Sequence, residues 1–146
     1  MARAQAAEDR FLSSSSVTGV RKRVYKDIDI RLTIRESGDV FKKTDAEAVK
    51  QAVKNLVMTN YYEKPFLPKY GGNVRAMLFE LADDETAEEV EQQIRGTISR
   101  FEPRAEVLNV VAEVKDEANA LGVSVTFRVI STNEIVTINQ FIQRLR

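Results

Sequence analysis

The side chains in this sequence that could do chemistry are acids and one arginine, placed before and after a single amphipathic segment. Four carboxylates are candidates: Glu80, Asp83, Asp84 and Glu102. Two carboxyl groups about 5 to 10 Å apart in a cleft can hydrolyse a glycosidic bond when one of them holds a proton. Glu102, however, is two residues from Arg104. A nearby positive charge stabilises the ionised carboxylate, which makes Glu102 a poor general acid.

The residue types that are absent narrow the chemistry further. The 146 residues include no histidine and no cysteine. Histidine is the commonest general base and metal ligand, and a thiolate is the other usual nucleophile. We therefore predict no catalytic residues beyond the weak carboxylate hypothesis, no metal site and no cofactor. Asp27 and Asp29 form an isolated D-x-D pair, which solvated acids on a strand explain better than a metal site does.

The composition predicts a water-soluble domain without a membrane partner. Hydrophobic residues make up 43% and charged residues 30%, and 22 basic residues balance 22 acidic ones. No apolar run approaches the roughly 20 residues that span a bilayer, and residues 1–16 lack the continuous apolar stretch of a secretion signal. A chain without net charge has no overall field that attracts nucleic acid.

The N-terminal segment is predicted to be a basic flexible arm over residues 1–23, ahead of one domain over residues 24–146. Over residues 1–26 the positive residues outnumber Glu8 and Asp9: Arg3, Arg10, Arg21, Lys22, Arg23 and Lys26. Such an arm could bind a phosphate backbone. Because the whole chain is neutral, we favour an arm that orders against a protein partner.

Two helices have clear starts, each marked by a threonine followed three residues later by a glutamate. These capping boxes begin at Thr44 and Thr86 and predict helices over 45–60 and 86–101. The second helix has an apolar stripe at about four-residue spacing: Val90, Ile94, Ile98 and Phe101. Pro103 then ends the helix.

Between these helices, residues 63–81 contain two prolines and a glycine pair. Pro65 and Pro68 predict an extended path, and Gly71-Gly72 predicts a tight turn before a short helix capped by Asn73. A glycine pair can cradle a phosphate. This one lacks the lysine and hydroxyl residue that follow in a P-loop, so a structural turn is the better interpretation.

Alternating apolar residues predict the strands. One set should share a face over 24–36: Ile28, Ile30, Leu32 and Ile34. A second strand should direct four residues to one face and Val107 and Val111 to the other: Leu108, Val110, Ala112 and Val114. The strand over 121–130 should point five residues inward: Leu121, Val123, Val125, Phe127 and Val129. A short loop over 116–120 joins the second of these strands to the strand over 121–130 in a hairpin.

The last segment, Ile135 to Arg146, is rich in β-branched residues and has no glycine or proline. It predicts a terminal strand with an exposed edge, able to pair with another chain. The predicted fold class is α+β: a small mixed or antiparallel β-sheet with about three helices packed on it and an exposed C-terminal strand.

Several short motifs together resemble the gene-25-like baseplate wedge family of T-even-type contractile-tail phages, which is related to a type VI secretion baseplate component. They include a loop motif, a Leu-Phe-Glu triplet and a Glu-Pro-Arg triplet at a helix end. Their residues are Lys64, Pro65, Phe66, Pro68, Tyr70, Gly71, Leu78, Phe79, Glu80, Glu102, Pro103 and Arg104. The likeness extends over about residues 24–146. Lys64 stands where the family often has arginine, which loses a bidentate fork.

The resemblance implies a structural subunit of the inner baseplate that docks on the helical core of the wedge and initiates the contractile sheath. It implies that Glu102, Pro103 and Arg104 bind the wedge core. It also implies a sheath-facing strand, with the 121–130 strand beside it: Ile135, Val136, Thr137, Ile138, Asn139, Gln140, Phe141 and Ile142. The implied partners are other baseplate wedge proteins and the tail sheath protein, with no small-molecule substrate. The implied location is the tail baseplate of the virion, after synthesis in the host cytoplasm. Lysozyme-like hydrolysis by carboxylates remains the alternative function.

Overall fold

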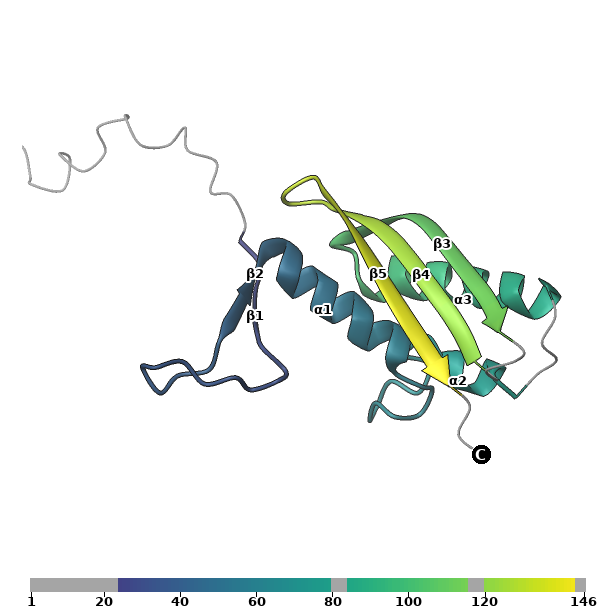
Figure 1. Ribbon diagram of the computed structural model, residues 1–146, viewed down its shortest axis with the longest axis horizontal. Coiled ribbons are helices and arrows are strands. Elements are labelled where there is room, and N and C mark those ends of the chain that lie inside the picture. The colour runs from purple at the N-terminus through teal and green to yellow at the C-terminus, as the bar shows by residue number, and fades with distance from the viewer. Residues whose placement is uncertain (1–23, 80–83, 116–119, 144–146) are drawn as a thin grey trace, which may run out of the picture.

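The computed structural model describes residues 24–79, 84–115 and 120–143. A three-stranded antiparallel sheet carries helices on one face, and a two-stranded N-terminal hairpin lies beside them (Figure 1). The elements in chain order are β1 (Lys26–Ile28), β2 (Lys42–Thr44), α1 (Asp45–Met58), α2 (Val74–Met77), α3 (Asp84–Phe101), β3 (Ala105–Lys115), β4 (Ala120–Val129) and β5 (Glu134–Gln143). The predicted α+β class is confirmed.

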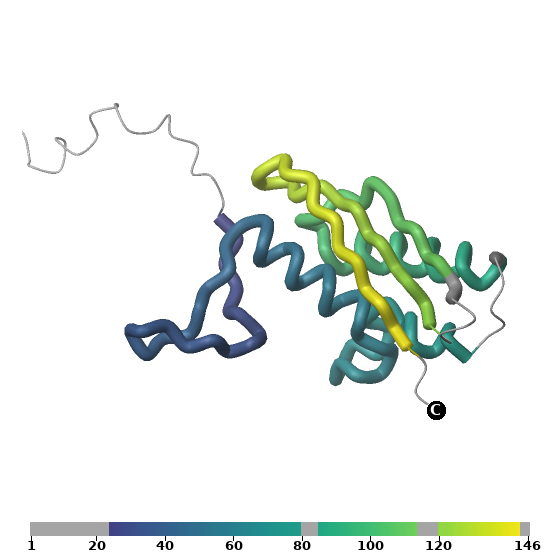
Figure 2. The backbone as a smooth tube through the Cα atoms, viewed as in Figure 1, coloured from purple at the N-terminus to yellow at the C-terminus, as the bar shows by residue number. Residues whose placement is uncertain are grey.

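The core lies between the large sheet and the helices α1 and α3. Val90, Ile94 and Ile98 of α3 are fully buried, as their spacing predicts. The five alternating residues of β4 from Leu121 to Val129 are buried against them, which confirms the inward face of that strand. α3 packs along β3, whereas α1 packs beside β5 (Figure 2).

The strand β3 differs from the prediction at two residues, Val107 and Leu108. The pairing of β3 with β4 shifts between Val107 and Asn109, so Leu108 is an extra, bulged residue. A bulge reverses the alternation of side chains from that point along the strand. Val107 therefore packs against the core and Leu108 is exposed, opposite to the prediction, while Val110 is buried as expected.

The predicted long strand over residues 24–36 is wrong, because β1 ends at Ile28. The backbone turns at Asp29, whose carbonyl accepts the N–H of Leu32 at 2.9 Å. The Gln51 side chain, buried on α1, holds this corner by donating to the Ile28 carbonyl at 2.8 Å. As a result the four apolar residues predicted to share a buried face are exposed: Ile28, Ile30, Leu32 and Ile34.

The Asp29 carboxylate fixes the corner and makes it sensitive to acid. Burial alone would raise the pKa of this carboxyl, but the hydrogen bond and charge of Lys43, the Arg31 N–H and the Thr33 hydroxyl outweigh burial. The pKa of Asp29 is therefore below its ordinary value of 3.8. The unfolded chain binds the proton more tightly, so this stabilisation is complete above about pH 4 and is lost as the pH falls through the folded pKa.

We expect residues 26–44 to become sensitive to protease as the pH falls below about 4, before the large sheet opens. The measurement is limited proteolysis with an acid-active protease, with cleavage sites located by mass spectrometry. Asp29→Asn should already be sensitive at about pH 5 and should change little with pH. Equal acid sensitivity in Asp29→Asn and the parent would contradict the assignment.

The helix starts also differ from the predicted capping boxes. Thr44 precedes α1, but its side chain makes no capping hydrogen bond, and α1 ends at Met58. Asp45 instead exchanges hydrogen bonds with the backbone of Tyr25. The helix α3 begins at Asp84, so Thr86 lies in its first turn rather than before it. Asn73 precedes α2 in a left-handed conformation and makes no side-chain cap.

Residues 61–70 form successive turns rather than the extended path that the prolines predict. The Tyr62 N–H donates to the Pro68 carbonyl at 2.8 Å, which closes the loop on itself. Tyr62 and Phe66 both have φ of 66°. The arm over 1–23 and the loop over 116–119 lie outside the described residues, as do residues 144–146, the end of the predicted terminal strand.

Candidate partner-binding site

The Glu-Pro-Arg triplet lies where helix α3 gives way to strand β3. The Glu102 N–H completes the last helical turn by donating to Ile98 at 2.8 Å, and Ala105 donates back to the Glu102 carbonyl at 3.1 Å. Pro103 between them is exposed. The helix therefore ends at Phe101 and turns at the proline, as the sequence predicts.

Glu102 and Arg104 bind each other across the proline. Nε of Arg104 donates to Oε1 of Glu102 at 2.6 Å, and Nη2 donates to Oε2 at 2.7 Å. Glu102 is buried, whereas 32% of the Arg104 side chain is exposed. Two parallel hydrogen bonds of this kind fix the plane of a guanidinium. The hydrogen bond to Glu102 is the main reason that the pKa of Arg104 is raised.

This pairing leaves part of the guanidinium available to another molecule. Nη1 of Arg104 donates to no acceptor within the part of the chain that the structure describes. The Tyr25 ring lies 5.2 Å from the guanidinium carbon, within the range of a cation–π contact. Tyr25 is in turn held at the start of α1 by Asp45. Sequence patterns assign Tyr25 no role at this corner, since only tertiary structure brings it there.

The loop motif reaches the same corner through Tyr70. Its ring lies 5.1 Å from the ring of Phe101, the last residue of α3. Nζ of Lys64 lies 3.9 Å from the centre of the Tyr70 ring. Burial raises the pKa of the Tyr70 hydroxyl, and the charge of Glu102 raises it further, while Arg104 opposes them. The motif and the triplet, distant in sequence, therefore form one surface.

Phe66 is the most exposed part of this surface. Its side chain is 100% exposed, and Pro65 and Pro68 on either side of it are exposed as well. The loop nevertheless has a defined shape, because the Tyr70 N–H donates to the Leu67 carbonyl at 3.0 Å. An exposed aromatic ring on an ordered loop is typical of a residue that inserts into a partner.

Gly71 places Tyr70 by letting two backbones approach closely. A Cβ atom at Gly71 would lie 2.2 Å from the Thr59 carbonyl oxygen, just after α1. The Thr97 hydroxyl of α3 donates to the Gly71 carbonyl at 3.3 Å. The glycine pair therefore joins α1 and α3, which agrees with a structural turn rather than a phosphate cradle.

The predicted sheath-facing strand, β5, forms one edge of the large sheet, since among the described residues it pairs with β4 alone. Its residues alternate between the two faces. The core side holds Val136, Ile138, Gln140 and Ile142, with both isoleucines buried. The opposite face holds four exposed residues: Ile135, Thr137, Asn139 and Phe141. The edge and outer face of β5 are thus open in this chain.

The described residues offer little for catalysis. Both carboxylate oxygens of Glu102 accept hydrogen bonds from Arg104, so neither is free to contact a substrate. Glu80 and Asp83, two further carboxylate candidates, lie outside the described residues. Across residues 24–79, 84–115 and 120–143 no group of acids is placed to hold a metal ion. None of the described helices is long and apolar enough to cross a membrane.

Solved structures contain similar folds. One chain of the anti-feeding prophage baseplate matches with a TM-score of 0.65 and 27% identity, over 73% of this chain and 86% of that one. A chain from Geobacter sulfurreducens, provisionally described as a tail lysozyme, has a TM-score of 0.60, 22% identity and coverage of 68% and 91%. A chain of the postcontracted pyocin R2 baseplate has a TM-score of 0.51, 17% identity and coverage of 82% and 99%. The last two likenesses show the fold alone.

Sequence comparison is more specific. The baseplate wedge protein gp25 of Enterobacteria phage T4 is 29% identical over 109 residues, which are 74% of this chain and 82% of the phage protein. Residues 43–134, which include the loop motif and the Glu-Pro-Arg triplet, match the family described as baseplate wedge protein gp25. Because that match spans well over half of the chain, the protein belongs to this family of contractile-tail baseplate components.

Proposed function

We propose that this protein is a non-catalytic wedge subunit that binds the helical core of the baseplate wedge through the Glu102–Arg104 corner and starts the sheath through β5. The observation that carries the first part is the buried Glu102, which orients the partly exposed side chain of Arg104. The family match and the baseplate neighbour support association with other baseplate proteins. The identity of the partners is our inference.

The geometry of the corner suits a protein acceptor. Glu102 fixes the plane of the Arg104 guanidinium and leaves Nη1 for a carbonyl or carboxylate of the partner. An arginine that is already ordered loses little conformational freedom on binding. A hydrogen bond to a charged group contributes about 1.5 to 3 kcal/mol when water is excluded. Tyr70, packed on Phe101, supplies apolar area beside it, and the exposed Phe66 lies on the same loop as Tyr70.

We expect Arg104→Ala to fold but to fail to join the wedge complex. Co-purification with the other wedge proteins, after a thermal melt of each variant, measures both properties. The change leaves Glu102 buried and unpaired, so some loss of stability is expected as well. A double variant, Glu102→Gln with Arg104→Gln, removes both charges together and should still fail to bind.

The matched control is Arg128→Ala, which removes a half-buried arginine whose ion pair with Glu106 is weak at 3.7 Å. It should melt and co-purify like the parent. Co-assembly of either Arg104 variant to the parent's extent would sink the proposal for the corner.

For the sheath, the supporting observation is the open edge of β5. A strand with an unpaired side can accept a strand from another protein, with main-chain hydrogen bonds supplying affinity. The outer face of β5, with Ile135 and Phe141 exposed, adds an apolar surface next to that edge. Glycoside hydrolysis is the less favoured function, since both carboxylate oxygens of Glu102 are engaged by Arg104.

A further inference from the structure

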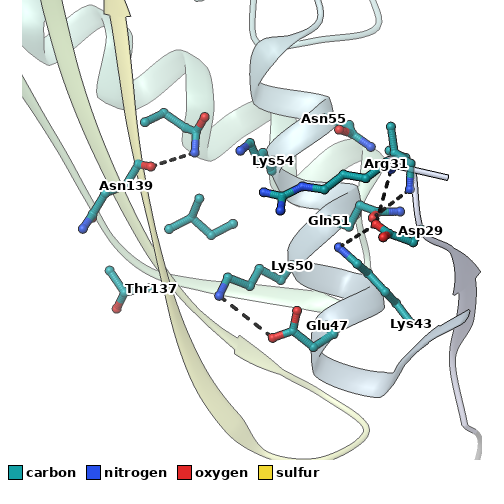
Figure 3. Close-up of a pocket in the computed structure, with 13 residues that line it drawn as sticks. Asp29, Arg31, Lys43, Glu47, Lys50, Gln51, Lys54, Asn55, Thr137 and Asn139 are labelled. Atoms are coloured by element: carbon teal, nitrogen blue, oxygen red, sulfur yellow. Dashed lines mark hydrogen bonds and ion pairs between the residues drawn. The ribbon is translucent and has the colours of Figure 1, made fainter. Parts of the chain in front are cut away.

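A groove of about 650 Å³ runs between the open edge of β5 and the polar side of α1. The N-terminal hairpin closes its far end through Asp29, Arg31 and Lys43 (Figure 3). Thr137 and Asn139 belong to the β5 wall of the groove. The groove therefore lies where a strand added to β5 would place its side chains.

The α1 and hairpin side of this groove is positively charged. Four cations line it: Arg31, Lys43, Lys50 and Lys54. Two acids oppose them. Lys43 is paired with Asp29 at 3.3 Å, and Lys50 is 4.0 Å from Glu47 with both side chains largely exposed.

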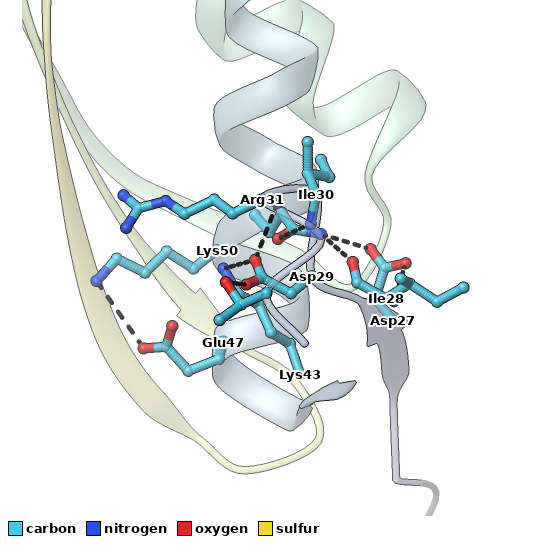
Figure 4. Close-up of polar contacts among 10 residues, drawn as sticks. Asp27, Ile28, Asp29, Ile30, Arg31, Lys43, Glu47 and Lys50 are labelled. Carbon is cyan, nitrogen blue, oxygen red and sulfur yellow. Dashed lines mark hydrogen bonds and ion pairs between the residues drawn. The ribbon is translucent and has the colours of Figure 1, made fainter. Parts of the chain in front are cut away.

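An exposed pair at that distance is weak, so Lys50 remains able to bind another anion. Arg31 and Lys54 have no acidic partner among the described residues. Figure 3 shows Arg31, Lys50 and Lys54 directed across the space toward β5, and Figure 4 shows Asp29 turned toward Lys43 instead.

The spacing of these cations matches that of an extended chain. Lys50 and Lys54 are one helical turn apart, about 6 Å along α1. Alternate residues of a strand point to the same side and are about 6.8 Å apart. α1 and β5 pack together and run in the same direction (Figures 1 and 2). Successive same-side residues of an added strand would therefore meet successive cations.

We propose that the sheath strand that pairs with β5 carries acidic residues at alternate positions, and that Arg31, Lys50 and Lys54 select it by charge. This inference rests on the proposed sheath function and adds the chemistry of the partner strand. The chain is neutral overall, with 22 basic and 22 acidic residues, so the excess of four cations over two acids along this groove is a local feature rather than a property of the whole surface. A strand with basic residues at the same positions would be repelled.

The test is a triple variant, Arg31→Gln with Lys50→Gln and Lys54→Gln, assembled into wedge-complete baseplates. Purified tail sheath subunit is then added, and the number of sheaths per baseplate is counted by electron microscopy. At about 0.05 M salt we expect the variant to initiate at least tenfold fewer sheaths than the parent. At about 0.5 M salt, where screening shortens the range of charge interactions, sheath initiation by the parent should fall towards that of the variant.

The matched control is a triple variant of exposed cations that do not line the groove, Lys42→Gln with Arg75→Gln and Arg95→Gln. It has the same change of net charge and should initiate sheaths like the parent. Initiation by the groove variant equal to that of this control would overturn the proposed charge selection. So would an equal loss in both triple variants, which would show an effect of net charge alone.

A cross-linking measurement distinguishes failure of the proposed charge selection from failure of the proposed sheath role. The chain has no cysteine, so Asn139→Cys provides a single thiol at the exposed side of β5. A thiol-linked photo-crosslinker there should capture the sheath subunit, whereas one at Glu88→Cys on α3 should not. Capture at Asn139 with no effect of the triple variant would leave the sheath role intact and reject the charge selection. No capture at Asn139 would reject both.

Discussion

Gly71→Ala is expected to destabilise the protein by about 3 kcal/mol or more, the sum of backbone strain and of an overlap that cannot relax cheaply. Gly71 has φ of +118°, which side chains rarely allow, and its new Cβ would lie 2.2 Å from the Thr59 carbonyl oxygen. The obstacle is backbone at the end of α1, so relief requires α1 and the loop to separate. Urea denaturation followed by circular dichroism gives the loss in free energy of unfolding.

Two other glycines make matched controls. Gly38 also has positive φ, +80°, but a Cβ there meets nothing within 4 Å, so Gly38→Ala should cost only about 1 kcal/mol from backbone strain. Gly96 lies within α3, with open space around it, and Gly96→Ala should stabilise by about 0.5 to 1 kcal/mol. Similar unfolding curves for Gly71→Ala and Gly38→Ala would show that the close approach to Thr59 is unimportant.

Gly71 also connects stability to binding. Tyr70 precedes it and packs on Phe101 at the corner that holds Arg104. Movement of Gly71 would displace Tyr70 and with it the apolar side of the proposed wedge contact. A loss of wedge binding by Gly71→Ala at a temperature where it remains folded is therefore expected. The glycine of the loop motif is therefore explained by the close approach of its backbone to Thr59.

The elements that could be predicted from sequence are those in which local periodicity and burial agree. The α3 stripe and the alternation of β4 belong to this class, because each residue's environment follows from its place in a regular element. The end of α3 at Phe101 was equally predictable, since Pro103 acts through covalent geometry.

Other features depend on contacts between distant segments. The bulge at Leu108 is defined by its pairing with β4, and no residue type marks it. The turn after Ile28 depends on Gln51, twenty-three residues away in the chain. Alternation alone predicted a longer strand there, because a run of isoleucines at period two has the same pattern whether it is buried or exposed. Tyr25 at the Arg104 corner is a third case.

The Glu102–Arg104 pair sharpens what the triplet means. The sequence alone presents two charged residues that could each contact a partner. In the structure both oxygens of Glu102 bind Arg104 and orient it. The contact with the partner is therefore made by the guanidinium and the aromatic rings around it. Glu102 is then a positioning residue. Exchange of either charge alone would leave the other one unpaired, which explains why the double variant is the cleaner test.

Truncation after Thr132 is expected to unfold the large sheet rather than remove only the sheath contact. β5 supplies Ile138 and Ile142 to the core, exposed by only 5% and 4%. Loss of a buried isoleucine side chain costs about 2 to 5 kcal/mol, and two such losses approach the 5 to 15 kcal/mol total stability of a typical domain. The truncation would also leave β4, whose alternate residues are apolar, as an unpaired edge. We expect the 1–132 chain to aggregate and to lose a cooperative thermal melt.

A chain ending at Gln143 retains all of β5 and is the matched control, expected to melt cooperatively like the parent. A cooperative melt of the 1–132 chain near the parent's temperature would contradict a core role for β5. If the truncation unfolds the protein, absence of sheath from truncated baseplates says nothing about strand pairing. The role of β5 in the sheath then has to be tested at residues such as Asn139, whose side chain is exposed and whose replacement leaves the core intact. Such substitutions are possible because the side chains of β5 alternate between the two faces of the sheet. Those on the core face stabilise the fold, and those on the outer face can contact a partner.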